Sequence, residues 1–207
     1  MKISVFGSGY VGLVQATVLA EVGHDVICMD IDQKKVESLQ QGHVSIFEPG
    51  LSALVRENLE SKRLRFTSDE KTAVEHGEVL FIAVGTPPSE DGSADLGQVF
   101  SVGDAVARHR KEPLILVEKS TVPVGTGDAL TAHINKPWSR PDARCNLTWC
   151  PTRNSSRKAR PSLIAAARTA SSLAVLVKKC VKSCATCTRR STATMTGSFS
   201  WTCAAPS

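Results

Sequence analysis

Long apolar runs are absent from this chain. No stretch approaches the roughly 18 apolar residues that a membrane helix needs, and the short apolar start at 1–6 runs into a glycine turn before it could form the core of a signal peptide. Cys28 is the only cysteine before residue 137, which argues against a disulfide framework there and fits a reducing compartment. We therefore expect a cytoplasmic protein with no membrane partner.

Acidic residues are scarce in the last third of the chain. Residues 137–207 hold one, Asp142, against 12 Lys and Arg, whereas residues 1–136 hold 19 acidic and 13 basic residues. Six of the seven cysteines also lie in the last third, and no histidine follows His133. The first part therefore carries a net charge of −6 and the second +11, so the whole-chain value of +5 averages two unlike segments.

Residues 1–136 contain a regular alternation of apolar strand patterns and helix patterns. The 42% hydrophobic content is enough for a core. Strands are expected at 3–6, 26–29, 65–66, 79–84 and 114–117, and helices near 13–20, 33–40, 51–61 and 96–108. This order predicts an α/β fold with a doubly wound parallel sheet of the Rossmann type, whose ligand site lies at the carboxyl ends of the strands.

The first expected strand ends in a glycine-rich turn, Gly7-Ser8-Gly9-Tyr10-Val11-Gly12. A lone G-x-G-x-x-G is a weak signal. Here it lies between a strand and a helix, and an acidic residue, Asp30, ends the next strand 18 residues after the last glycine, close to the spacing of roughly 20 that a dinucleotide site shows. The turn therefore predicts a dinucleotide-binding βαβ unit.

Each position in this motif has a physical reason. Gly7 permits the tight turn, Gly9 lets the backbone approach a pyrophosphate, and Gly12 lets helix and strand pack closely. The free N–H groups of the helix start would bind the phosphates. Asp30 would accept hydrogen bonds from a ribose diol and repel a 2′-phosphate, which favours NAD over NADP.

Two further strand ends carry threonines. Thr86 follows the fourth expected strand and Thr121 follows the fifth. The alternative interpretation is turn chemistry before proline, but Gly7, Asp30, Thr86 and Thr121 all fall at the sheet edge where such folds bind ligands. We therefore include both threonines in the candidate site.

These residues resemble the nucleotide-sugar 6-dehydrogenases of the UDP-glucose/GDP-mannose dehydrogenase family. The resemblance covers roughly 1–136, and its last motif favours the UDP-glucose type over the GDP-mannose type. The motifs that carry it are GSGYVG (7–12), MDID (29–32) followed by Lys35, FEPGL (47–51), AVGTPP (83–88) and EKSTVPVGT (118–126).

The resemblance implies a set of NAD contacts: Val11, Asp30, Lys35, Thr86 and Thr121, with the turn residues Gly7, Gly9, Tyr10 and Gly12. Lys35 taken alone reads as an exposed helix lysine, and only the family match gives it a role beside the ribose. Thr121 would also position a catalytic water. No metal site is expected.

The activity implied by the resemblance is NAD-dependent oxidation of UDP-glucose to UDP-glucuronate, a four-electron change at C6. It passes through a thioester on a cysteine in a later domain, which has no match in this chain. The family's sixth strand and its NPEFLKEG-type loop are not matched either. We therefore expect a sheet truncated before its sixth strand and a chain that binds NAD at most. A homo-oligomer is implied for the intact enzyme only.

Three interpretations compete for residues 137–207. A zinc module would use Cys180, Cys184 and Cys187, but it lacks a second C-x-x-C pair and any histidine. A basic nucleic-acid arm fits the charge, but it lacks interleaved aromatic residues, so no nucleic-acid partner is expected. The third interpretation is that these residues are read in the wrong frame.

The wrong-frame hypothesis can be tested on the residues. If true codons start at the third base of each written codon, Trp149 to Arg160 permits V-S-N-P-E-F-(F/L)-K-E-G-A, which resembles the missing loop. The valine is forced because tryptophan has one codon, and the other positions are only permitted. Two later stretches, 158–174 and 187–207, permit further family-like segments.

We therefore predict two segments: an NAD-binding Rossmann domain at 1–136 and an out-of-frame, largely disordered tail at 137–207. The slip of frame would lie between roughly Asn135 and Leu147. Two alternatives stay open. One is a non-catalytic NAD-binding module with a basic tail, and the other is a dehydrogenase of GDP-mannose or a UDP-N-acetylaminosugar.

Overall fold

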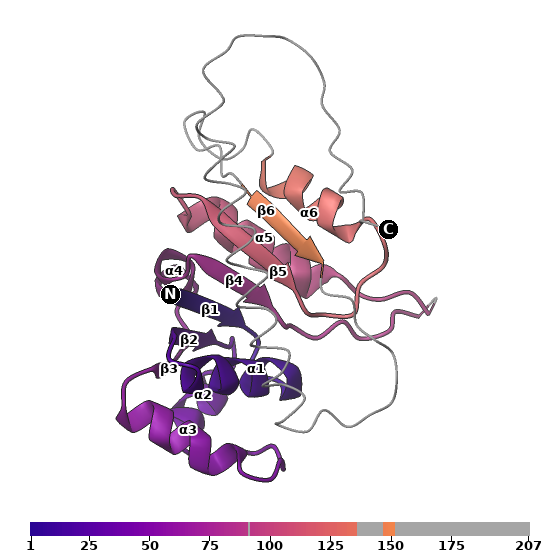
Figure 1. The fold of residues 1–207 in the computed structure, drawn as a ribbon. Coiled ribbons are helices and arrows are strands. Elements are labelled where there is room, and N and C mark those ends of the chain that lie inside the picture. Colours follow the sequence, from indigo (N-terminus) through magenta and orange to yellow (C-terminus); the bar gives the residue numbers. More distant parts are fainter. Residues whose placement is uncertain (91, 136–146, 152–207) are drawn as a thin grey trace, which may run out of the picture.

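The computed structural model describes residues 1–90, 92–135 and 147–151, the last of these by its backbone alone. They form one parallel sheet with helices on both faces (Figure 1). The strands are β1 (Lys2–Phe6), β2 (Asp25–Met29), β3 (Leu64–Thr67), β4 (Val79–Ile82), β5 (Leu114–Glu118) and β6 (Leu147–Pro151). The helices are α1 (Tyr10–Glu21), α2 (Gln33–Gln40), α3 (Leu51–Glu60), α4 (Glu70–His76), α5 (Gly97–His109) and α6 (Thr126–Ile134). No helix in these described segments is both long and apolar enough to cross a bilayer.

The strand order is β3-β2-β1-β4-β5-β6, and every pairing is parallel. The chain builds outward from β1 in one direction, then returns to β1's other side at β4. At the carboxyl end of β1, Phe6 lies opposite Met29 of β2 and Ile82 of β4. The switch point between β1 and β4 is where folds of this order bind their ligands.

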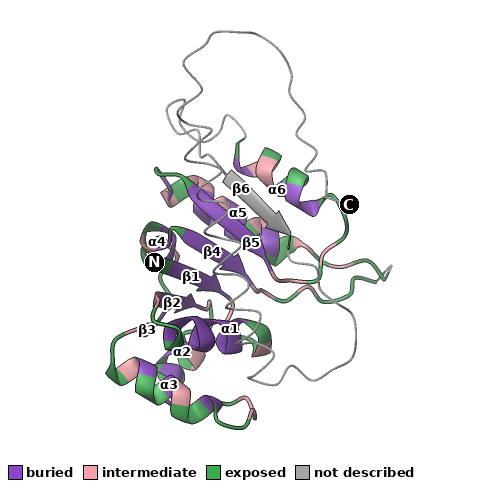
Figure 2. Ribbon diagram, viewed as in Figure 1, coloured by how far each residue is buried: buried purple, intermediate pink, exposed green. Residues whose placement is uncertain are grey.

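Two hydrophobic cores cover the two faces of the sheet, because successive strand residues point to opposite sides. On β5, Ile115 and Val117 pack with α1, α2 and α3, while Leu114 and Leu116 pack with α4, α5 and α6. Figure 2 shows the central strands buried along their length. Parallel strands covered on both faces read as continuous apolar runs, which is why the sequence signal for the sheet was strong.

The Rossmann-type parallel sheet is confirmed, but three elements differ from the expectation: α4, α6 and β6. Helix α4 was not expected, because its seven residues are too few to show a helical period. Asp69 starts it by accepting hydrogen bonds from the N–H groups of Lys71 (3.0 Å) and Thr72 (3.3 Å). A short capped helix of this kind depends on its first residues rather than on amphipathic repetition.

The sixth strand, β6, corrects the expectation that the sheet stops before it. The backbone of β6 pairs in parallel with β5, from Leu114 opposite Leu147 to Glu118 opposite Pro151. An uncovered β5 edge would leave a row of backbone donors and acceptors unpaired, and the Thr-Trp stretch within β6 has high strand propensity. The rest of the expected tail, 137–146 and 152–207, lies outside the described residues.

Candidate functional site

A cavity of about 400 Å³ opens at the carboxyl ends of β1, β2 and β4. Helix α5 and the first residue of α4 form its other walls. The cavity therefore lies at the switch point of the sheet, where the sequence placed the ligand site. It is lined by Phe6, Gly7, Gly9, Met29, Asp30, Ile31, Lys35, Glu70, Ala83, Val84, Gly85, Gln98, Ser101, Val102 and Ala105.

The glycine turn has the geometry that its motif predicts. Gly7 has a φ of +99°, and a Cβ there would lie 2.5 Å from the carbonyl oxygen of Ala83. A Cβ on Gly12 would lie 1.8 Å from the carbonyl oxygen of Gly7. Both positions therefore exclude a side chain. At Gly7 the turn and the residue after β4 leave no room, and at Gly12 helix α1 packs directly on the turn.

Gly9 differs from the other two glycines because its neighbourhood is open. A Cβ at Gly9 would meet no atom within 4 Å. The residue precedes α1, whose first turn has no side-chain cap and no acidic residue. The partial positive charge of the helix start is therefore left for another anion, and a pyrophosphate could approach the backbone here without displacing protein atoms.

Asp30 is held in place by three neighbours. Its Oδ2 accepts hydrogen bonds from the Ser8 N–H (2.8 Å), the Ser8 hydroxyl (2.5 Å) and the Lys35 ammonium (3.0 Å). Its Oδ1 accepts a hydrogen bond from the Asp32 N–H (3.1 Å). Lys35 thus lies beside Asp30 as the family resemblance implied, and one carboxylate oxygen carries most of the contacts.

The electrostatics of Asp30 favour the ionised carboxylate. Burial alone would raise its pKa, but the hydrogen bonds from Ser8, Asp32 and Lys35 outweigh that effect and lower the pKa to about 2. The group is therefore ionised at neutral pH and acts only as an acceptor. An acceptor of this kind suits the hydroxyls of a ribose diol and repels a phosphate.

Thr86 and Thr121 lie next to each other, at the ends of β4 and β5. The Thr86 hydroxyl donates to the carbonyl oxygen of Thr121 (3.0 Å), and the Ser120 hydroxyl donates to that of Val84 (2.8 Å). Neither threonine lines the cavity beside Asp30. The structure thus brings the two predicted threonines together, but at a neighbouring stretch of the same sheet edge.

Tyr10 and Val11, which the motif also singled out, begin helix α1. Val11 is 47% exposed. The Tyr10 hydroxyl donates to Oε2 of Glu48 (2.7 Å) in the loop between α2 and α3. Tyr10 therefore links the glycine turn to the FEPGL segment, two motifs that the sequence presented separately.

Sequence reasoning missed several residues of this site. Ser8 was given no role within the motif, yet it is 1% exposed and holds Asp30 by two hydrogen bonds. Gln98, Ser101 and Glu70 line the cavity from α5 and α4. Helical spacing, which puts Gln98 and Ser101 on one face of α5, is the one sequence signal that could have paired two of them.

A second carboxyl group at this edge behaves differently from Asp30. Glu118 ends β5 and is 4% exposed. Burial raises its pKa to about 7, against the lowering effect of hydrogen bonds from Ser120 and the Lys119 N–H. Burial also lowers the pKa of the neighbouring Lys119 ammonium. The charge of Glu118 therefore changes near neutral pH.

Comparison with known proteins supports the family resemblance and the predicted cofactor. The profile of the UDP-glucose/GDP-mannose dehydrogenase family, NAD binding domain, matches residues 1–170. UDP-glucose 6-dehydrogenase of Rhizobium meliloti (strain 1021) is 51% identical over 137 residues, which are 66% of this chain and 31% of that protein. UDP-glucose 6-dehydrogenase TuaD of Bacillus subtilis (strain 168) is 45% identical over 135 residues, 65% of this chain and 29% of that protein.

Solved structures give the same result. A UDP-glucose dehydrogenase from Pyrobaculum islandicum superimposes with a TM-score of 0.67 at 36% identity, over 73% of this chain and 35% of that one. A GDP-mannose dehydrogenase from Pseudomonas aeruginosa gives the same TM-score, identity and coverage. The chain thus spans about a third of the length of the proteins that it matches. The prediction of an NAD-binding domain is confirmed.

Proposed function

Because this chain belongs to the UDP-glucose/GDP-mannose dehydrogenase family, we propose that it forms the NAD-binding domain of an enzyme that oxidises UDP-glucose to UDP-glucuronate. Two relatives named UDP-glucose 6-dehydrogenase, at 51% and 45% identity, support this substrate. A GDP-mannose or UDP-N-acetylaminosugar dehydrogenase would have the same cofactor domain and is the alternative. Cys28, which is free and buried, fits the cytoplasmic location that we also propose.

The observation that carries the proposal is the placement of Asp30 beside an open, uncapped helix start. In this arrangement Asp30, beside Lys35, would accept hydrogen bonds from the hydroxyls of the NAD ribose. The N–H groups after Gly9 would bind the pyrophosphate. NAD, when bound, supplies the hydride acceptor for the C6 alcohol. The described residues bind and orient it.

We propose that Thr86 and Thr121 contact the part of NAD that extends beyond the cavity toward β5. The bond from the Thr86 hydroxyl to the Thr121 carbonyl leaves the Thr121 hydroxyl exposed at the sheet edge. That hydroxyl could hold a water for the hydrolytic step implied by the family resemblance. Tyr10 and Val11 would lie on the solvent side of the bound pyrophosphate.

For the last third of the chain we keep the proposal of a shifted reading frame. The compared relatives match this chain over 137 and 135 residues, about the length of segment 1–136, whereas the family profile reaches residue 170. No residue here is matched to the catalytic cysteine implied by the family. We therefore propose that the 207-residue chain binds NAD without oxidising a sugar.

Two measurements test these proposals. Calorimetric titration of the 207-residue chain should show NAD binding at least tenfold tighter than NADP binding, because Asp30 repels the 2′-phosphate. Resequencing of codons 135–147 should then reveal a shifted frame. The protein expressed from the restored frame should produce NADH from UDP-glucose and much less from GDP-mannose. An unshifted gene whose product still oxidises UDP-glucose would overturn the frame proposal.

A further inference from the structure

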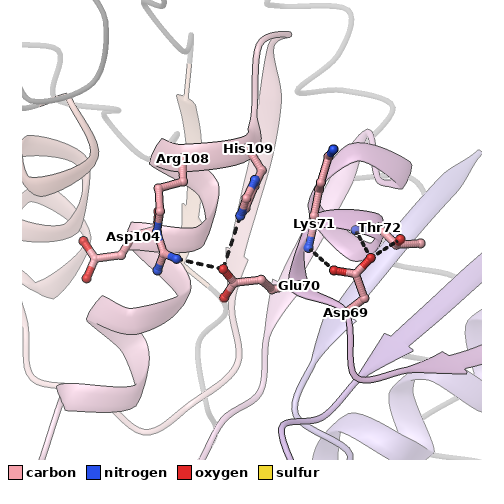
Figure 3. Close-up of polar contacts among 7 residues, drawn as sticks. All are labelled: Asp69, Glu70, Lys71, Thr72, Asp104, Arg108 and His109. Atoms are coloured by element: carbon pink, nitrogen blue, oxygen red, sulfur yellow. Dashed lines mark hydrogen bonds and ion pairs between the residues drawn. The ribbon is translucent and has the colours of Figure 1, made fainter.

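Glu70 is a carboxylate in the cavity wall that has no part in the proposed contacts to ribose and pyrophosphate. It is the first residue of α4 and lines the same cavity as Asp30. The Asp69 cap fixes the start of this helix through the N–H groups of Lys71 and Thr72 (Figure 3). The backbone of Glu70 is therefore held at the edge of the cavity.

The Glu70 side chain is oriented by two basic residues at the end of α5. Its Oε1 accepts a hydrogen bond from Arg108 Nη1 (2.9 Å) and another from His109 Nε2 (3.2 Å). Figure 3 shows both dashed lines meeting at one carboxylate oxygen. Within the described part of the chain, Oε2 makes no hydrogen bond. The hydrogen bonds between α4 and α5 account for the role of Oε1. They also fix the orientation of the carboxylate, so Oε2 is left as an acceptor for another group.

The cavity between the two carboxylates is mainly apolar. Ile31, Val84 and Val102 line it together with Asp30 and Glu70, and Ile31 is 82% exposed. A mainly apolar cavity with a carboxylate acceptor in its wall suits a flat heteroaromatic ring that carries an amino group. If Asp30 binds the ribose, the base attached to that ribose would enter the same cavity, which Glu70 also lines.

We propose that Glu70 Oε2 accepts a hydrogen bond from the exocyclic amino group of the adenine in NAD, and that Glu70 thereby selects adenine over a 6-oxopurine. This assignment rests on the proposed NAD function. Arg108 and His109 are positioning residues, because they act only by holding Oε1. The selectivity comes from the group at position 6 of the purine. The amino group of adenine donates to the carboxylate, whereas the oxygen of a 6-oxopurine would place a second acceptor against it.

The test compares NAD with deamino-NAD, which has the same size but carries hypoxanthine. Calorimetric titration of the 207-residue chain should show NAD binding about tenfold tighter, the effect of one charge-assisted hydrogen bond. In Glu70→Ala the affinities for NAD and deamino-NAD should differ by no more than about twofold. Glu75→Ala, on an exposed residue of the same helix, should leave the ratio unchanged.

Glu70→Gln gives an independent prediction. Arg108 and His109 would still hold the amide oxygen, so the amide NH₂ would occupy the place of Oε2 and present a donor. The preference should then reverse in favour of deamino-NAD. A reversal cannot come from unfolding, which would weaken both ligands alike. Arg108→Ala should reduce the preference for NAD over deamino-NAD without reversing it.

The outcomes separate the two proposals. If the wild-type chain binds NAD but binds deamino-NAD within twofold as well, the Glu70 assignment is wrong and the NAD-binding function stands. If the Glu70→Gln chain keeps the wild-type preference, the assignment is also wrong. Failure of the wild-type chain to bind NAD at all would overturn the proposed function and the Glu70 assignment together.

Discussion

The two ends of the sheet use charged side chains in different ways. At the end where β4 and β5 begin, Arg110 is 6% exposed and donates to the carbonyl oxygens of Val74, Glu112 and Pro113 at 2.9, 2.9 and 3.0 Å. At the carboxyl end of the strands, Asp30 is held but still borders an open cavity. Charged side chains thus serve folding at one end and, in the function proposed above, ligand binding at the other.

The difference follows from the backbone. Helix α4 ends beside Arg110, so its last carbonyls need donors, and a buried guanidinium supplies several in a fixed geometry. At the carboxyl edge, helix α1 begins with no side-chain cap, and the residue before it, Gly9, lines the cavity. An end that is fully satisfied by the protein stabilises the fold, whereas an end left open can bind a ligand.

The largest effect should come from removing the Arg110 hydrogen bonds at the end of the sheet where β4 and β5 begin. Arg110→Met should lower the free energy of unfolding by about 2–4 kcal/mol, because it strips buried carbonyls of their donors. Urea denaturation followed by circular dichroism measures this loss. Lys111→Met, at the exposed neighbouring position, should change stability by less than about 0.5 kcal/mol. Equal losses in both variants would show that Arg110 does not stabilise the α4 end.

The next effect concerns the binding end. Asp30→Ala should weaken NAD binding about 10- to 100-fold, because hydrogen bonds to an ionised group are strong, and should narrow the preference for NAD over NADP. Titration calorimetry with both dinucleotides measures this change. Asp25→Ala, at the opposite end of the same strand, is the control and should leave NAD affinity intact. Unaltered affinity in Asp30→Ala would mean that the ribose binds elsewhere.

Two carboxyl groups at the binding end should make stability depend on pH in opposite directions. The pKa of Glu118 is raised to about 7 from 4.5, so its contribution is fully present below pH 4.5 and is lost as pH rises through about 7. The pKa of Asp30 is lowered from 3.8 to about 2, so its contribution is present above pH 3.8 and is lost as pH falls through about 2.

Urea denaturation between pH 4 and pH 8 tests the Glu118 part of this pattern. Glu118→Gln should remove a loss of about 1–3 kcal/mol that the wild-type chain shows as pH rises through this window. Asp30→Asn, whose effect lies at more acid pH, serves as the control and should keep the wild-type slope. If the free energy of unfolding of Glu118→Gln still falls with pH as steeply as in the wild-type chain, another group is responsible for the titration.

Local motifs explain how much of this site could be read from sequence. The turn at 7–12 and Asp30 were predictable, because a glycine pattern, a helix start and an acidic strand end lie within one βαβ unit. The contact from Glu70 to His109 spans 39 residues and depends on how α4 and α5 pack. Helix α4 itself was too short for its period to show. Sequence therefore predicts the main groups of this one unit, although not Ser8, and misses groups such as Glu70 whose place depends on two units.

The smallest effect tests a contact between two such motifs. Tyr10→Phe removes the hydrogen bond from Tyr10 to Glu48 and should lower the free energy of unfolding by about 1 kcal/mol, since the contact is only partly buried. Glu48→Gln retains an acceptor and should lose less. A double-mutant cycle on these two residues measures their coupling energy, and a value near zero would contradict the link. NAD affinity in Tyr10→Phe should fall less than in Asp30→Ala. The glycine turn proposed to bind the pyrophosphate is set by the packing at Gly7 and Gly12 rather than by the tyrosine hydroxyl.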